Sequence, residues 1–230
     1  GRFIDINHNE DNKVEYILNN YSDYERFEDE HKYFEYMSSI DDKLISQKSE
    51  EVSEEKTNDL LVEWLKTYEW ETIKNELHIL ATHKTSKDDV LKFLAAPVRL
   101  EFLTALAIKS KLPNVKVIPN YSCDDTGLPT STAGGNKGDI ECFEEDKGIL
   151  VEVTMAEGRT QTMMEIWPIE RHLEDFIKNN NFEAQAIFTA PTIYADSKRQ
   201  IDYVKYSKQL VIRDYAIDSL VEYLENKDKL

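Results

Sequence analysis

Two carboxylates, Asp139 and Glu152, have the types and spacing that could do chemistry together. Asp139 opens one short segment that reads as a strand, and Glu152 lies near the end of the next, Ile-Leu-Val-Glu-Val-Thr. A tight turn through residues 144–148 would pair these two strands and bring both carboxylates to one sheet edge. Two converging oxygen donors are typical ligands of a divalent metal such as Mg²⁺.

The second strand alternates in a way that decides where Glu152 points. Its period of two places Glu152 and Thr154 on one face, and Ile149, Val151 and Val153 on the other. A buried Glu152 would need a metal, another cation or a shifted pKa. The alternative is an edge strand whose polar face meets water.

A helix expected over residues 160–179 adds further polar groups. Gln161 and Glu165 are four residues apart and share a helix face, and His172 lies two turns beyond Glu165. A histidine beside carboxylates can act as a general acid or base. By itself, His172 would more often be a surface or helix-capping residue. The loop over residues 122–137 leads into Asp139 and is either a substrate-contacting loop or an ordinary hairpin connection.

The elements around these residues predict an α/β fold. Residues 12–83 are acidic with helical spacing, although the stretch 47–57 is either a solvated helix face or a loop. A helix should begin near Thr85, Pro97 should interrupt it, and a second should cover residues 98–107. We expect a mixed β-sheet flanked by helices, and two regions, an acidic helical extension (1–84) and a catalytic domain (85–230). The expected strands are 115–118, 139–143, 149–154, 184–189 and 209–212, and the later helices are 160–179, 195–206 and 218–226.

Net charge and cysteine content indicate how the protein could bind DNA and in which cellular compartment it works. The 230 residues carry a net charge of −17, which opposes DNA binding because phosphate neutralisation needs Lys and Arg. A DNA-acting chain of this charge should rely on a separate recognition domain for affinity. Only two cysteines occur, without zinc or redox spacing, which favours a reducing cytoplasm. No signal peptide pattern or membrane span is apparent.

Residues 97–212 resemble the cleavage domain of AlwI-type type IIS restriction and nicking endonucleases, in the PD-(D/E)xK nuclease superfamily. The similarity is strongest over residues 138–173, which include Gln-x-x-x-Glu-x-x-Pro-x-x-Arg-His-Leu. The resemblance implies a restriction-endonuclease-like fold and a metal-dependent type II site-specific deoxyribonuclease. It assigns catalytic roles to Glu101, Asp139, Glu152, Gln161, Glu165 and His172, and metal binding to Asp139, Glu152, Glu101 and the carbonyl of Val153.

The chain departs from the superfamily pattern at one position. Thr154 stands two residues after Glu152, where a lysine is usual, as it does in the AlwI-type branch. The group that positions the attacking water is therefore open among Gln161, Glu165 and His172. Arg171 is either a contact to the scissile phosphate or an ordinary surface residue.

The expected reaction is hydrolysis of a phosphodiester in double-stranded DNA with one or two Mg²⁺ ions, in the bacterial cytoplasm. One active site cuts one strand, so double-strand cleavage needs a second catalytic domain, in a homodimer or a distinct small subunit; otherwise the enzyme nicks. Two alternatives are a catalytically silent nuclease-like interaction module and a repair or RNA-processing nuclease of the same superfamily. The convergent acidic residues argue against the silent module.

Overall fold

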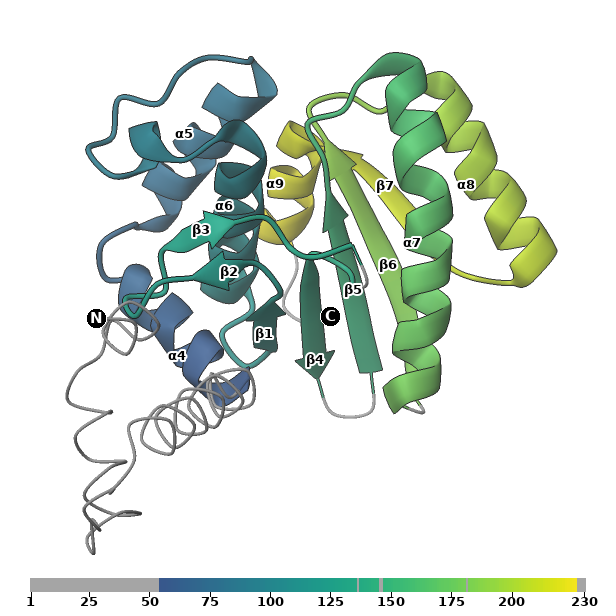
Figure 1. Cartoon of the computed structure of the whole chain (residues 1–230), viewed down its shortest axis with the longest axis horizontal. Coiled ribbons are helices and arrows are strands. Elements are labelled where there is room, and N and C mark those ends of the chain that lie inside the picture. Colours follow the sequence, from purple (N-terminus) through teal and green to yellow (C-terminus); the bar gives the residue numbers. More distant parts are fainter. Residues whose placement is uncertain (1–53, 136, 145–146, 181, 227–230) are drawn as a thin grey trace, which may run out of the picture. The chain divides into compact units, whose positions relative to one another are not determined.

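The computed structural model describes residues 54–135, 137–144, 147–180 and 182–226 (Figure 1). The helices expected between residues 12 and 53, with most of the acidic stretch 47–57, lie outside the described residues. Helix α4 (Glu54–Trp64) and helix α5 (Trp70–Ala81) belong to the same compact unit as the sheet, Glu54–Leu230. None of the described helices has both the length and the apolar composition needed to cross a membrane.

The main sheet has five strands in the order β1-β4-β5-β6-β7. The first three strands are antiparallel neighbours, whereas β5, β6 and β7 run parallel, so the sheet is mixed. Their bounds are β1 (Lys116–Pro119), β4 (Ile140–Glu144), β5 (Lys147–Val153), β6 (Glu183–Ala190) and β7 (Ile212–Ala216). Because β5 is central, the edge-strand alternative for Glu152 is wrong.

Helices cover both faces of this sheet (Figure 1). On one face lie α6 (Ala96–Lys111) and α9 (Ile217–Glu225), with α5 packed against them, and on the other lie α7 (Gly158–Asn180) and α8 (Ala195–Lys208). Strand alternation matches this layering, because Ile149 and Val151 join the first core and Leu150 joins the second. The predicted α/β class follows from these two apolar faces.

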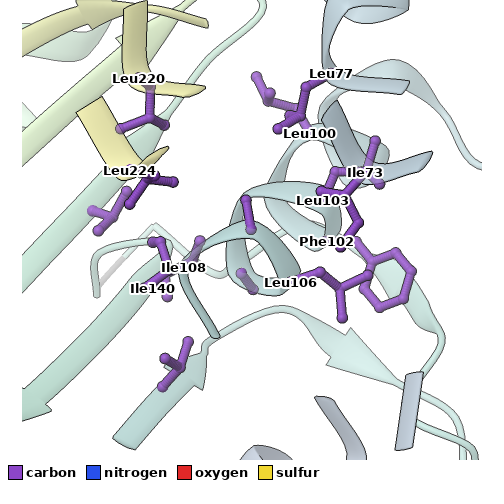
Figure 2. Close-up of a cluster of buried hydrophobic side chains, with 14 of the residues drawn as sticks. Ile73, Leu77, Leu100, Phe102, Leu103, Leu106, Ile108, Ile140, Leu220 and Leu224 are labelled. Atoms are coloured by element: carbon purple, nitrogen blue, oxygen red, sulfur yellow. The ribbon is translucent and has the colours of Figure 1, made fainter. Parts of the chain in front are cut away.

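Helix α6 is the centre of the first core (Figure 2). All its residues from Arg99 to Lys109 are buried, as expected for a helix enclosed on every side. Figure 2 shows side chains of α5, α6, β4 and α9 meeting around it. Full burial of a Leu or Phe side chain contributes roughly 1.5–3 kcal/mol, so this core holds Glu101 at a defined place.

Three predicted boundaries differ from the structure. Pro97 lies in the first turn of α6, where its missing N–H has no helical partner to lose, so it starts this helix instead of interrupting one. The helix expected from Thr85 is only the short 3₁₀ helix η1 (Leu91–Phe93). The strand expected at 209–212 begins at Ile212, because Gln209 adopts a left-handed conformation (φ 59°) that ends α8.

The segment before β4 contains a small two-stranded sheet, β2 (Ser122–Cys123) and β3 (Pro129–Ser131). The side chain of Asp124 accepts backbone hydrogen bonds from Thr126 and Leu128 and so closes its turn. The chain then continues from β3 towards Asp139. Part of the expected 122–137 loop is therefore a hairpin, and its remainder contacts the candidate site.

Candidate active site

Asp139 and Glu152 lie side by side, as the expected hairpin required. The β4–β5 register pairs Ile140 with Val151, so Asp139 stands opposite Glu152 one position further along. The backbone N–H of Val153 donates a 2.7 Å hydrogen bond to Oδ2 of Asp139. Asn120 fixes the approach to Asp139, because its Nδ2 donates to the carbonyl of Gly138 at 2.8 Å.

These two carboxylates repel each other in a partly dry environment. Burial, then repulsion from Glu152 and Glu101, raises the pKa of Asp139 well above its usual range. Burial also raises the pKa of Glu152, whose side chain belongs to a residue only 8% exposed, although a hydrogen bond with His172 opposes the shift. Such an arrangement favours either a proton or a cation at the site.

His172 is the direct partner of Glu152. Its Nδ1 lies 2.8 Å from Oε1 of Glu152, and its Nε2 lies 3.3 Å from the carbonyl oxygen of Gly135. The hydrogen bond to Glu152 raises the pKa of His172, because both ring nitrogens face acceptors and the imidazolium can donate from both. His172 is buried, so its interpretation as a surface residue is wrong.

Glu101 joins the site from α6. Its Oε2 accepts a 2.9 Å hydrogen bond from the backbone N–H of Ala133, in the segment that leads to Asp139. Burial is the largest influence on Glu101 and raises its pKa from 4.5 to about 7; repulsion from Glu152 adds to the shift, and the Ala133 hydrogen bond opposes it. Glu101 is therefore within the electrostatic reach of the β4–β5 carboxylates.

Glu165 completes the acidic cluster, which consists of Glu101, Asp139, Glu152 and Glu165. The hydroxyl of Thr154 donates a 2.9 Å hydrogen bond to Oε1 of Glu165 and accepts one from the N–H of Ala156. Burial raises the pKa of Glu165, and the Thr154 hydrogen bond partly offsets this. Thr154, two residues after Glu152, thus holds the carboxylate of Glu165.

The hydrogen bonds of Gln161 lie away from the acidic cluster, and its predicted catalytic role stays a prediction. Its Nε2 donates to the carbonyls of Ala156 and Thr192, and its Oε1 accepts from the N–H of Tyr194, all at 2.9 Å. The buried amide therefore joins the loops after β5 and β6 and does not contact the acidic cluster through these bonds. Gln161 shares a helix face with Glu165, but its polar atoms are engaged elsewhere.

Arg171 borders the cluster at the surface. Its Nη2 donates to the carbonyl of Gly135 at 3.1 Å and lies 3.2 Å from Nε2 of His172. Arg171 and His172 together therefore hold the Gly135 carbonyl next to the site. Val153, the expected carbonyl ligand, contributes its N–H to Asp139, and metal binding by its carbonyl stays a prediction.

Two supporting residues were not identified from the sequence, Asn120 and Gly138. A Cβ atom at Gly138 would lie 2.4 Å from Cδ1 of Leu150 and 2.9 Å from Oε1 of Glu152, so only glycine fits beside the cluster. The signal for Gly138 was its place immediately before Asp139. No local pattern identifies Asn120, whose contact crosses eighteen positions of sequence.

The donor chemistry of the cluster fits a hard divalent cation, since carboxylate oxygens are the ligands that Mg²⁺ prefers. In the part of the chain that the structure describes, no three His, Cys, Asp or Glu side chains are already arranged as a metal site. One oxygen of each of three carboxylates has a hydrogen-bond partner: Ala133 for Glu101, Val153 for Asp139 and His172 for Glu152.

Comparison with known proteins identifies the fold. The small subunit of the heterodimeric restriction endonuclease R.BspD6I has a similar crystal structure, with a TM-score of 0.54 and 25% sequence identity. The match covers 66% of this chain and 78% of that subunit, and it confirms the predicted restriction-endonuclease-like fold. No curated protein sequence matches the chain.

The sequence model of the AlwI restriction endonuclease family matches residues 5–217. This range includes every member of the acidic cluster, together with Thr154 and His172. The family and the fold both support a DNA endonuclease. The chain belongs to the AlwI restriction endonuclease family.

Proposed function

We propose that this chain is the cleavage domain of a type IIS restriction or nicking endonuclease, which hydrolyses a phosphodiester of double-stranded DNA in a metal-dependent reaction. The observation that carries the proposal is the acidic cluster. Four carboxyl groups from α6, β5, α7 and the start of β4 have pKa values raised by burial. Such a grouping is unfavourable for stability by itself and suits a site that receives a cation.

In this proposal Asp139, Glu152 and the carbonyl of Val153 hold one or two Mg²⁺ ions, and Glu101 completes or supports the site. When bound, Mg²⁺ would stabilise charge on the phosphate and lower the pKa of a water molecule. His172 orients Glu152 through the 2.8 Å contact of its Nδ1. Glu165, held by Thr154, is the best placed carboxylate to orient the attacking water.

His172 is less suited to act as the base. Both its ring nitrogens have partners, and its raised pKa favours the protonated form. Gln161 is also disfavoured, because its amide joins two loops. By resemblance to the superfamily, the products would carry a 5′-phosphate and a 3′-hydroxyl.

Two further features belong to the proposal. Sequence recognition comes from a separate domain, since a chain with a net charge of −17 lacks the cations for tight DNA affinity. Cutting both strands requires a second catalytic subunit, either a copy of this chain or a distinct protein. The similar crystal structure supports this, because it is that of the small subunit of a heterodimeric restriction endonuclease.

The test uses the full-length protein and supercoiled plasmid that carries its recognition sequence. We expect Asp139→Asn and Glu152→Gln to abolish strand cleavage and to retain sequence-specific binding, since neither change alters the recognition domain. Glu170→Gln is the matched control, because Glu170 is a buried carboxylate of α7 that lies 3.3 Å from Nζ of Lys208. Undiminished nicking by either site variant would remove the acidic cluster from the mechanism.

A further inference from the structure

Helix α7 has an apolar face exposed to solvent beside the acidic cluster. Met163, Met164 and Trp167 are 72%, 63% and 55% exposed, which is unusual for large apolar side chains on consecutive helical turns. We call this surface the α7 outer face. It consists of the exposed residues in the first four turns of the helix: Arg159, Thr160, Met163, Met164, Trp167 and Arg171.

The charge of the α7 outer face is opposite to that of the chain. Its two charged residues are arginines, and the two acidic residues of the same turns point elsewhere. Glu165 is bound to the Thr154 hydroxyl at 2.9 Å, and Glu170 is buried near Lys208. Exposed acids flank the face at Glu157, Glu174 and Asp175, but between Arg159 and Arg171 its exposed charges are positive, which suits a polyanion in a chain with a net charge of −17.

The position of the face identifies which polyanion. The opposite side of α7 supplies Glu165 and His172 to the cluster, and an α-helix with its side chains is only about 10–12 Å across. Arg171 connects the two sides, since its Nη2 reaches the Gly135 carbonyl in the segment before Asp139. If the scissile phosphate lies at Asp139 and Glu152, as in the proposed function, a bound duplex passes close to α7.

We propose that the α7 outer face contacts the duplex next to the scissile phosphate; this inference rests on the proposed function. Arg159 and Arg171 are twelve residues apart, roughly 18 Å along the helix, which corresponds to about five phosphates of one strand. They contact the backbone at the two ends of the face. Met164 and Trp167 contact the sugars and base edges between them.

The first experiment measures cleavage by the full-length protein in single turnover on an oligonucleotide duplex. We expect the double variant Met164→Ala, Trp167→Ala to cleave roughly tenfold more slowly, in line with the loss of one base contact to an aromatic ring. Arg159→Gln should lower the salt dependence of DNA binding by about one phosphate contact. Tyr206→Ala is the control, because Tyr206 is 83% exposed on α8 and lies outside the α7 outer face.

The second experiment detects the contact directly. Iodouracil placed beside the cut position should form a photochemical crosslink to Trp167 in the complex of full-length Asp139→Asn protein with DNA, and Trp167→Phe should shift or weaken it. A crosslink confined to other elements, with unchanged cleavage by the double variant, overturns the inference. The inference is also overturned if, without DNA, Trp167 is protected from fluorescence quenching by acrylamide and sedimentation gives twice the mass of the chain. That result would assign the α7 outer face to a protein partner.

The two proposals fail in different ways. If the wild-type protein cuts and the α7 variants cut equally fast, the DNA contact is wrong and the proposed function stands. If the wild-type protein does not cut DNA with Mg²⁺ at any concentration, the proposed function is wrong, and the crosslink still decides the contact. A crosslink at Trp167 with slower cleavage by the double variant supports both.

Discussion

Replacing Glu101 with Gln should make the metal-free protein more stable and less active. The folded-state pKa of Glu101 is about 7 against an ordinary value of 4.5, and this difference of 2.5 units corresponds to about 3 kcal/mol. The residue is 4% exposed, so solvent screens this energy little. Gln removes the charge and keeps an oxygen to accept the 2.9 Å hydrogen bond from Ala133.

The pH dependence of the stability gain shows whether it comes from removing the charge of Glu101. Because the folded pKa of Glu101 is raised, the ionised carboxylate destabilises the fold fully above pH 7, and the destabilisation disappears as the pH falls towards 4.5. Glu101→Gln should therefore raise the free energy of unfolding by up to about 3 kcal/mol at pH 8, and most of this gain should be lost by pH 5.

The assay is urea unfolding of the full-length protein with EDTA at both pH values, together with plasmid nicking in Mg²⁺. Glu170→Gln is again the control, since Glu170 already has Lys208 as a cationic partner at 3.3 Å and should gain no stability. An equal gain for Glu101→Gln at pH 8 and pH 5 would assign it to packing. No gain at pH 8 would show that Glu101 is not electrostatically strained.

Two further predictions test the surroundings of the cluster. Gly138→Ala should impair cleavage in plasmid assays, because the new Cβ would lie 2.9 Å from Oε1 of Glu152. Gly148→Ala is the control, because its Cβ would lie 2.4 Å from Cε2 of Phe182. It should lower the free energy of unfolding in urea by about 1–3 kcal/mol but leave cleavage by the folded protein intact. Mg²⁺ affinity should fall as the pH drops below about 7, because Glu101 then retains a proton that the metal must displace. Calorimetric titration in two buffers of different ionisation enthalpy measures that proton release, and its absence at pH 6.5 would exclude Glu101 from metal binding.

The parts of the fold that the sequence predicted are those governed by short-range patterns. Alternation in β4 and β5 was sufficient to place Asp139 beside Glu152, because the hairpin connects consecutive strands. Helical spacing likewise placed Glu165 and His172 on one side of α7, where they reach Thr154 and Glu152. The catalytic roles of these residues stay predictions.

Features that depend on long-range packing were not predictable in this way. Gln161 has the helical spacing of a site residue, yet its amide is hydrogen-bonded to Thr192 and Tyr194, which lie 31 and 33 positions away in the chain. Pro97 shows the same limit locally, since proline is compatible with both the first turn of a helix and its end. In the structure Pro97 lies in the first turn of α6, and the buried part of this helix begins at Arg99.

The departure at Thr154 has a physical explanation in the structure. A lysine at position 154 would place a cation in the cluster. The Thr154 hydroxyl instead donates a 2.9 Å hydrogen bond to Glu165 and so holds an additional carboxylate there. The cationic group nearest to Glu152 is then His172, whose raised pKa favours the imidazolium. In the proposed function, His172 on α7 supplies the positive charge next to Glu152, and Glu165 is the group that orients water. In the variant Thr154→Lys, the new ammonium group should therefore compete with His172 for the carboxylate of Glu152. It should not take over the role of Glu165.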